Sequence, residues 1–289
     1  IKKIYLIKKI TQKHKSHYCI SMLSQTNVIV LLASIFNNHS KIILCERNDP
    51  YKQKFNIYWK FLIRYTYKYA DCICVNSPNA FKFFSKFINK NKLKITLNHI
   101  EFKNLNNNIT KEKIILAVGR INFQKGYDIL INAFKESDAH HKGWCLKIVG
   151  NFSDINYYQK LKELSKNYIN KSIFIIDEVQ NIEKIYSQSS AYIIASRFEG
   201  TPNSFLEAAS MSMPCIVSDS INLGDKFLID KENVILFNSQ NIESCKKSIN
   251  FLINNYKTAL KYGNNLKSLI LRKYSLKKAN SSWDEIIKT

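Results

Sequence analysis

Short apolar runs alternate with longer amphipathic stretches along most of the 289 residues. A short apolar run between turn residues is typical of a buried strand, and apolar residues three or four apart indicate a helix. In the first third of the chain, we predict strands at Tyr18–Met22, Lys41–Cys45, Asp71–Val75 and Lys94–Leu97. We predict helices at Gln25–Phe36, Phe55–Tyr69 and Asn79–Ile88, the last capped by Ser77 with Pro78 at its first position. This alternation predicts a parallel sheet.

A polar, Asn-rich stretch, Asn98–Thr110, is interpreted as a linker, and the alternation restarts after it. Strands are predicted at 113–118, 144–149, 172–176, 191–195, 214–218 and 233–237. Helices are predicted at 127–136, 155–168, 181–188, from about 241 to 271, and at 276–288. The fold class is therefore α/β, with two Rossmann-like domains and parallel sheets. The first domain is expected to be incomplete, because it shows four strands where about six are usual.

Composition and charge limit the partners and the cellular setting that we expect for this protein. The net charge is +22, and residues 1–107 carry 19 Lys and Arg against 4 Asp and Glu. A basic surface attracts anionic membranes or nucleic acid, but a lysine-rich composition explains the charge equally well. We expect no nucleic-acid partner, because no helix-turn-helix, RNA-recognition or zinc-finger pattern is present. The seven cysteines show no metal-ligand spacing and fit a reducing, cytoplasmic setting.

The most informative stretch runs from Arg197 to Glu207 and follows the apolar run 191–195. Thr201 suits a helix N-cap and Pro202 the first helical position, so Glu199 is expected in a strand-to-helix loop and Glu207 in the helix. Ligands of open α/β sheets bind at this end of the strands, and helix N-termini hold anions. Either glutamate alone is explained equally well as a solvated residue.

The spacing Glu-x7-Glu, with Gly-Thr-Pro-Asn between, resembles the signature of family-four glycosyltransferases, which are retaining enzymes with the two-domain GT-B fold. The resemblance implies that Glu199 contacts the donor sugar and that Glu207 holds the ribose of the nucleotide. It also implies a donor-binding stretch formed by Gly200, Thr201, Pro202, Asn203 and Ser204. In this family a final helix crosses back onto the first domain, and Trp283 would anchor it; a plain terminal helix with one buried Trp is the alternative.

A second match is Gly119-Arg120 with Gln124-Lys125-Gly126. Lys125 opens a helix, where a cation is unfavourable unless an anion binds beside it. Arg120 and Lys125 therefore suit a diphosphate, and the resemblance implies that they neutralise the leaving nucleoside diphosphate. Gly150 and Asn151 follow the next strand and suit close approach to the donor, although an ordinary turn explains them equally well.

The third match is Glu46-Arg47-Asn48-Asp49-Pro50, which resembles a run in the bacterial exopolysaccharide and capsule branch of the family. Arg47 and Asn48 are candidates for the sugar pocket; a structural turn is the alternative. No catalytic base is assigned in this domain. Asp177 and Glu178 lie where the family contacts the base of the nucleotide.

The resemblance implies transfer from a UDP- or GDP-type nucleotide sugar to a glycan or polyprenyl-diphosphate-linked acceptor, with Glu199, Arg120 and Lys125 as catalytic residues. It implies no metal and no cofactor, because positive side chains can stabilise the leaving group. We expect a cytoplasmic protein, peripheral on the inner face of the membrane. The expected domains are 1–107 with the linker, 108–272 for the nucleotide sugar, and the helix 273–289.

The start at Ile1 and the absence of glycine before Gly119 lead us to expect an N-terminally truncated family member. Such a chain is expected to bind the donor nucleotide without transferring sugar. The alternatives to a glycosyltransferase are therefore a catalytically incompetent nucleotide-sugar-binding fragment and a polyanion-binding protein.

Overall fold

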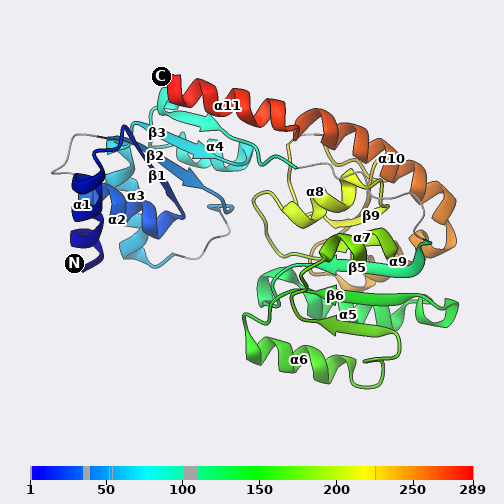
Figure 1. Cartoon of the computed structure of the whole chain (residues 1–289). Helices are drawn as coiled ribbons and strands as arrows, with labels where there is room; N and C mark the ends of the chain where they lie inside the picture. Colours follow the sequence, from blue (N-terminus) through cyan, green and yellow to red (C-terminus); the bar gives the residue numbers. More distant parts are fainter. Residues whose placement is uncertain are drawn as a thin grey trace. The chain divides into compact units, whose positions relative to one another are not determined.

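The computed structural model describes residues 2–34, 40–51, 53, 55–100, 110–224 and 226–288. The chain divides into two compact units, which are described separately (Figure 1). Unit 1 comprises Ile1–Asn98 and Lys277–Thr289, and unit 2 comprises His99–Leu276. Both contain a parallel sheet with helices, which confirms the predicted α/β class. The predicted helix end at 35–36, most of the predicted linker and the boundary at 107/108 lie outside the described residues.

The limits of the units differ from those expected from sequence. Ile100 is buried, and its amide donates to the carbonyl of Tyr274 at 3.2 Å, so the chain already belongs to unit 2 at this point. Residues 273–276 also belong to unit 2, because Tyr274 is buried beside Phe227 with ring centroids 6.1 Å apart. Local packing thus shifts both limits relative to the predicted 107/108 and 272/273.

The sheet of unit 1 has four strands among the described residues, in the order β1-β2-β3-β4. They are β1 (Tyr18–Met22), β2 (Lys41–Glu46), β3 (Cys72–Val75) and β4 (Leu93–Ile95), all parallel. The four predicted strands are confirmed. The helices are α1 (Lys2–His14), α2 (Ser24–Ser34), α3 (Ile57–Thr66), α4 (Pro78–Phe84) and α11 (Leu276–Lys288).

The two faces of this sheet carry different helices, because successive strand residues point to opposite sides. Ile42 and Leu44 pack with residues of α2, α3 and α4 in one core cluster. Ile43 points to the other face, where it packs with Ile286 and Trp283 of α11. The hydroxyl of Tyr18 also donates to the carbonyl of Ile287 at 2.5 Å. The terminal helix is therefore part of unit 1.

Two helix starts in unit 1 show how the sequence sets the boundaries. Ser77 caps α4 by accepting from the amide of Ala80 at 3.2 Å, and Pro78 follows at the first helical position, which confirms the predicted cap. Asn56 caps α3 by accepting from the amide of Trp59 at 3.1 Å, so α3 begins two residues later than predicted.

The sheet of unit 2 has six parallel strands among the described residues, in the order β10-β9-β8-β5-β6-β7. The strands, which confirm the six predicted, are β5 (Glu112–Val118), β6 (Cys145–Val149), β7 (Ile173–Ile176), β8 (Ser189–Ile194), β9 (Cys215–Ser218) and β10 (Ile235–Phe237). The order reverses between β5 and β8, which is the switch point where doubly wound sheets bind ligands.

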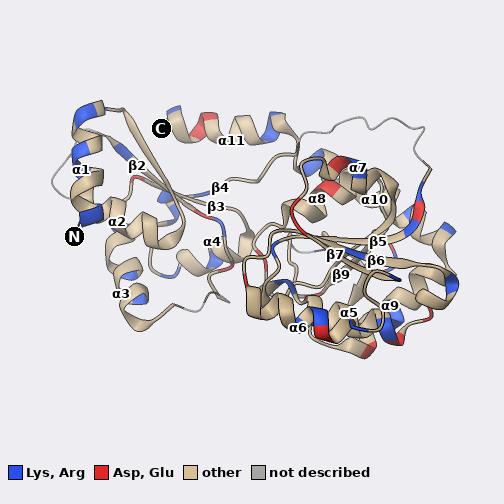
Figure 2. Ribbon diagram, turned by 60° about the horizontal axis from the view of Figure 1, so that its bottom comes forward, with Lys and Arg blue, Asp and Glu red and all other residues tan. Residues whose placement is uncertain are grey.

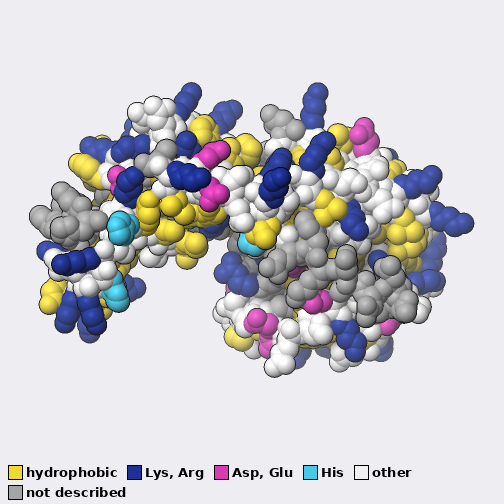
Figure 3. All heavy atoms as spheres, turned by 45° about the horizontal axis from the view of Figure 1, so that its top comes forward, with side chains coloured by type: hydrophobic (Ala, Val, Ile, Leu, Met, Phe, Trp, Pro, Cys, Tyr) yellow, Lys and Arg dark blue, Asp and Glu magenta, His cyan; other side chains and the backbone are white. Residues whose placement is uncertain are grey.

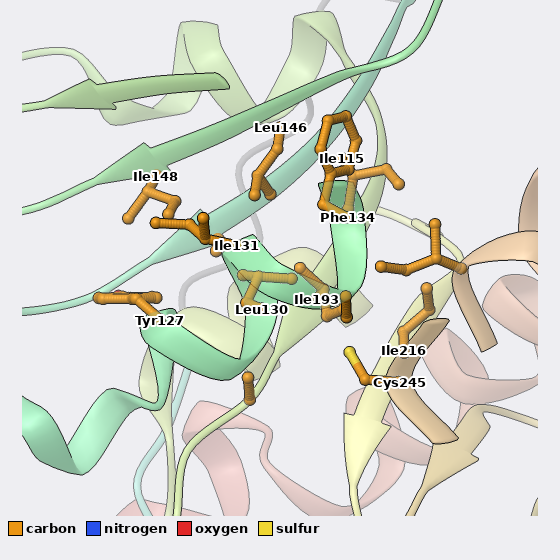
Figure 4. Packing of buried hydrophobic residues seen from close by; sticks show 14 of the residues in the cluster. Ile115, Tyr127, Leu130, Ile131, Phe134, Leu146, Ile148, Ile193, Ile216 and Cys245 are labelled. Carbon is orange, nitrogen blue, oxygen red and sulfur yellow. The ribbon is translucent and has the colours of Figure 1, made fainter. Parts of the chain in front are cut away.

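The helices of unit 2 are α5 (Tyr127–Glu136), α6 (Ile155–Ser165), α7 (Ile182–Gln188), α8 (Asn203–Ser210), α9 (Ile242–Asn254) and α10 (Tyr256–Lys273). Helix α5 carries much of the core: Leu130, Ile131 and Phe134 are fully buried and lie against strand residues such as Ile115 and Ile193 (Figure 4). This packing fixes the ends of β5 and β8, and with them the loops that follow.

Candidate functional site

Two loops meet at the switch point of the unit 2 sheet. The first follows Val118 at the end of β5 and runs to Gly126, and the second follows Ile194 at the end of β8 and leads into α8. Because β5 and β8 are hydrogen-bonded neighbours, both loops leave the same edge of the sheet. The chain thereby brings together the two sequence motifs that carry Lys125 and Glu199.

Lys125 and Glu199 form an ion pair in which Nζ lies 2.6 Å from Oε1. Their side chains are only 13% and 12% exposed. The hydroxyl of Ser196 donates to the same carboxylate oxygen at 2.9 Å. Lys125 ends a short 3-10 turn, Phe123–Lys125, directly before α5, which agrees with its predicted place at a helix start. The carboxylate is thus held in one orientation by two donors.

The backbones of the two loops are also joined. Gln124 Nε2 donates to the carbonyl of Phe198 at 3.0 Å, and the amide of Arg197 donates to the carbonyl of Gln124 at 2.8 Å. Gly126 has a φ of +66°, and a Cβ at this position would lie 2.1 Å from the carbonyl oxygen of Ala195. Glycine is therefore required where the first loop touches the second.

Arg197 was not predicted as a site residue, yet it supports the site. Its guanidinium donates to both carboxylate oxygens of Asp128, at 3.1 and 3.0 Å, and to the carbonyl of Phe123 at 2.6 Å. It also stacks over the ring of Phe123, with Cζ 3.8 Å from the ring centroid. Burial raises the pKa of Asp128, but hydrogen bonds from Arg197 and Tyr157 outweigh this and hold it below its ordinary value. This cluster fixes the turn that carries Lys125.

Two features of the sequence point to this cluster. Asp128 lies in the first turn of a predicted helix, and Arg197 lies just before the Glu-x7-Glu motif. Asp128 and Arg197 are 69 residues apart, and each has residues of opposite charge closer in the sequence, such as Lys125 for Asp128 and Glu199 for Arg197. The sequence alone does not select the partner. The strand order does, because it places the two loops side by side.

Gly150 and Asn151 hold the first loop from the other side. The amide of Ile121 donates to the carbonyl of Asn151 at 2.8 Å. A Cβ on Gly150 would lie 2.1 Å from the carbonyl oxygen of Gly119, so the chain itself requires glycine here. The structure thus shows a close approach between two segments of the protein at Gly150, and the approach to the donor stays a prediction.

The start of α8 differs by one residue from the prediction. Pro202, rather than Thr201, is the N-cap, because its φ of −79° and ψ of 105° are extended, and the proline side chain itself makes no capping hydrogen bond. Ser204 Oγ donates to the carbonyl of Val118 at 2.9 Å and accepts from the hydroxyl of Tyr192 at 2.9 Å. The hydroxyl of this predicted donor-binding residue therefore ties α8 to β5.

Glu207 lines a cavity of about 260 Å³, together with Asn203, Tyr186 and Met211. The hydroxyl of Tyr186 donates to Glu207 Oε2 at 3.0 Å and to the carbonyl of Ser204 at 3.0 Å. Burial raises the pKa of Tyr186, so this phenol remains a hydrogen-bond donor. The second glutamate of the motif is thus oriented at the mouth of a hollow in unit 2.

Arg120 lies in the first loop and is exposed. Within the described ranges, its side chain has no hydrogen-bond or ion-pair partner. Gly119, by contrast, is tied in place, because its carbonyl accepts from the hydroxyl of Tyr127 at 2.9 Å. A cation on a fixed backbone, beside the end of β5, is placed to meet an anion at the sheet edge.

In the Glu46–Pro50 run of unit 1, Glu46 is the last residue of β2 and the other four residues follow the strand. Glu46 is 2% exposed and accepts from Ser24 Oγ at 2.7 Å, from Asn27 Nδ2 at 2.9 Å, and from the hydroxyl of Tyr67. Arg47 Nη1 donates to Asn98 Oδ1 at 2.9 Å. These contacts account for Glu46 structurally, while Arg47 and Asn48 remain half-buried beside it. The sugar-pocket role of Arg47 and Asn48 stays a prediction.

The family model described as Glycosyl transferases group 1 matches residues 99–269, which nearly coincide with unit 2. The chain belongs to this family. The predicted glycosyltransferase family is thereby confirmed. No helix in the described segments is long and apolar enough to cross a membrane.

Relatives and solved structures of glycosyltransferases agree with this assignment. An uncharacterized glycosyltransferase of Methanocaldococcus jannaschii is 31% identical over 76% of this chain, which spans 59% of that relative. An α-1,4-N-acetyl-D-galactosaminyltransferase of Campylobacter jejuni, named for a diNAcBac-PP-undecaprenol acceptor, is 24% identical over 92% of this chain and 73% of the relative. The crystal structure of HepE from Anabaena, in complex with UDP and glucose, is 14% identical and has a TM-score of 0.86 over 98% of this chain and 81% of HepE. The predicted GT-B fold is confirmed by this similarity.

Proposed function

We propose that this glycosyltransferase group 1 protein transfers a sugar, with retention of configuration, from a UDP- or GDP-type nucleotide sugar to a lipid-linked glycan acceptor. The observation that carries the proposal is the Lys125–Glu199 pair at the switch point of the unit 2 sheet. A carboxylate fixed by two donors, one of them a lysine whose loop also carries an exposed arginine, suits a ligand that joins a sugar to a diphosphate.

Each charged residue then has a separate role. Arg120 and Lys125 stabilise the negative charge that develops on the leaving diphosphate, so the reaction needs no metal ion. Glu199 positions the sugar through hydrogen bonds rather than acting as a nucleophile, and Ser196 holds its orientation. Glu207 accepts hydrogen bonds from the ribose hydroxyls. Gly200, Thr201 and Asn203 lie between the two glutamates in the sequence, and Asn203 lines the same cavity as Glu207.

The relatives support the proposed substrates. The Campylobacter jejuni enzyme is named for an undecaprenyl-diphosphate acceptor, and HepE has been crystallised with UDP and glucose. An enzyme that uses a polyprenyl-linked acceptor must reach the membrane surface. Unit 1 is suited to bind an anionic membrane, because α1 and α3 carry basic residues and no acidic residue (Figure 2). Synthesis of a bacterial surface polysaccharide at the inner face of the plasma membrane is the proposed setting.

The test has two stages. Calorimetry with UDP, GDP and ADP, and then with their sugars, identifies the donor. A transfer assay with a polyprenyl-diphosphate-linked glycan then measures turnover, and NMR of the product reports the anomeric configuration. The proposal requires transfer with retention, and Glu199→Gln should lower turnover far more than it changes nucleoside diphosphate affinity, because Lys125 and Arg120 remain to bind the diphosphate. Binding without transfer would instead support a nucleotide-sugar-binding protein, and inversion would exclude the retaining mechanism.

A further inference from the structure

Three thiols lie together on the face of the unit 1 sheet that carries α11. Cys45 of β2 and Cys74 of β3 are paired across the two strands, and both are buried. Cys72 lies two residues before Cys74 on the same strand and therefore points to the same face. Its Sγ lies 4.0 Å from Cys74 Sγ. All seven cysteines of the chain are free thiols, and the proposed transferase site uses none of them.

Cys72 differs from the other two because it opens into a cavity of about 230 Å³. Two lysines, Lys41 and Lys94, line this cavity, against one acidic residue, Asp71. The carboxylate of Asp71 is already engaged, since it accepts from the amide of Ile42 at 2.6 Å. The cavity therefore favours a small anionic molecule beside a thiol.

The surroundings also favour the reactive form of Cys72. Hydrogen bonding to Cys74 and the charge of Lys94 hold the pKa of Cys72 below its ordinary value, although burial opposes them. Cys19 and Cys145 are also only partly buried, but burial raises the pKa of both. Because the thiolate is the nucleophile, Cys72 should react before either of these two.

We propose that Cys72 and Cys74 form a redox-active dithiol that reacts with anionic low-molecular-weight disulfides. The Cys72 thiolate attacks one sulfur of the disulfide, a mixed disulfide forms on Cys72, and one thiolate leaves. Hydrogen bonding and burial raise the pKa of Cys74, so this thiol passes its proton to the thiolate that has just left. It then attacks Cys72 Sγ, so that a Cys72–Cys74 bond forms and the second thiolate leaves. The protein loses two electrons and two protons, and the small disulfide is reduced to two thiols.

The spacing of the two residues makes such a bond reversible. Two residues along a strand separate the Cα atoms by about 6.6 Å, at the upper limit of about 6.8 Å for disulfides. The bond is therefore strained, and strained disulfides are readily reduced. Reducing compartments retain disulfides of this transient kind rather than structural ones. The thiols pack with Trp283 and Ile286 of α11, so formation of the disulfide also changes the packing of α11 on the sheet.

The first experiment treats the whole chain with glutathione disulfide and maps modified cysteines by mass spectrometry over time. Wild type should form the Cys72–Cys74 bond. Cys74→Ser should accumulate glutathione on Cys72, and Cys72→Ser should leave Cys74 unmodified. Cys19→Ser and Cys145→Ser are the matched controls and should behave as wild type. Lys94→Gln should slow the first step about threefold, because the lost thiolate fraction is partly offset by greater nucleophilicity.

The second experiment separates geometry from oxidation. Phenylarsine oxide binds two adjacent thiols at once and needs no oxidant. It should bind wild type and both control variants in a ratio of one to one, and lose its tight binding in Cys72→Ser and Cys74→Ser. Cys45→Ser should keep the tight binding, because Cys45 is fully buried and does not line the cavity. Circular dichroism checks that each variant is folded. The proposal is overturned if Cys72 reacts no faster than Cys19 and Cys145, or if Cys74→Ser accumulates no adduct on Cys72.

Discussion

Lys125 Nζ lies 2.6 Å from Glu199 Oε1, although the two residues are 74 positions apart in the chain. Each belongs to a separate sequence motif, and each follows a different strand at the switch point of the sheet. The pair shows that the two motifs form one site. It also means that neither residue can be changed without altering the electrostatic surroundings of the other.

We predict that Lys125→Met destabilises unit 2 by about 1–3 kcal/mol, because it leaves a mostly buried carboxylate unpaired. Glu199→Gln should cost less, because an amide still accepts from Ser196. The double variant should be more stable than the sum of the two changes implies, since the unpaired charge is gone. Urea unfolding of the four proteins measures this cycle. Strict additivity would show that the pair contributes no coupling energy.

We predict that Glu207→Ala weakens nucleoside diphosphate binding about ten- to hundredfold, because it removes hydrogen bonds to a charged group worth about 1.5–3 kcal/mol. Tyr186→Phe should have a smaller effect in the same direction, since it only frees the carboxylate. Calorimetry measures both. Glu163→Ala is the control, because that carboxylate is 77% exposed on α6. If wild type and Glu207→Ala bind the nucleoside diphosphate with equal affinity, Glu207 does not hold the ribose.

Gly150→Ala should destabilise unit 2 by at least about 3 kcal/mol, since the new methyl group collides with backbone that cannot move aside. Gly143→Ala is a matched control: its φ is also positive, at +74°, but no atom lies within 4 Å of the added Cβ. That change should cost about 1–2 kcal/mol from backbone conformation alone. Thermal and urea unfolding measure the loss of stability in each variant. Equal losses in the two variants would show that the collision at Gly150 does not add to the cost.

The buried Glu46 should make unit 1 less stable as the pH rises. Burial raises the pKa of Glu46 in the folded state, although hydrogen bonds from Tyr67, Ser24 and Asn27 oppose it. The folded protein therefore holds this proton more tightly than the unfolded chain, whose Glu has a pKa of about 4.3. Stability from this group is fully present below that pH and is lost as the pH rises through the folded-state pKa.

Glu46→Gln removes this titration. Hydrogen exchange in peptides that span β2 should become nearly independent of pH above about 4, after correction for the intrinsic exchange rate. The wild type should lose protection as the pH rises over the same range. Glu243→Gln is a control, since that residue lies on α9 of unit 2 and should leave the exchange of β2 unchanged. Identical profiles for Glu46→Gln and wild type would contradict the assignment.

Unit 1 should bind anionic membranes. Helix α3 presents Ile57, Tyr58 and Phe61 at 77%, 75% and 58% exposure, beside the exposed cations Lys60 and Arg64. Figure 3 shows Lys and Arg side chains spread over the surface, with hydrophobic side chains among them on unit 1. Each cation near acidic lipid contributes about 1 kcal/mol, and salt screens it.

Co-sedimentation with phosphatidylglycerol vesicles at low salt measures this binding. Changing Lys60 and Arg64 to Gln should weaken it, whereas changing the exposed Lys171 and Lys184 of unit 2 to Gln should not. If wild type stays in the supernatant, the positive charge reflects composition only.

The sequence predicts the strands well because each is a compact apolar run, and ten such runs became strands of two parallel sheets. Boundaries were less certain where a single cap decides them. Asn56 starts α3 later than its apolar pattern suggests, and Pro202 starts α8 later than its local signal suggests. For α3 the apolar pattern begins before the residue that caps the helix, and for α8 the residue preferences at Thr201 and Pro202 point to a start one residue too early.

The site was predictable as a list of residues but not as a network. The motifs identify Lys125, Glu199 and Glu207, but they do not show that the first two pair with each other. Arg197 and Asp128 carry no motif, because their contact depends on the order of strands in the sheet. Ser204 was expected at the donor, yet its hydroxyl is engaged within the chain. Local sequence patterns identify polar residues of the site, but they do not show which of these residues pair with each other across the fold.

Unit 1 is built from two segments that flank unit 2 in the sequence, and this has a consequence for the order of synthesis. Its sheet leaves the ribosome before unit 2, whereas α11 leaves after all of unit 2 has been made. At a synthesis rate of about 5–20 residues per second, α11 follows the sheet by roughly ten to forty seconds. During that time α11 does not yet cover the sheet face that carries Ile43, Cys45 and Cys74. Unit 2 is continuous and can close first. A nascent chain therefore passes through a stage in which the later half is folded and the earlier half still exposes an apolar sheet, a natural target for chaperones.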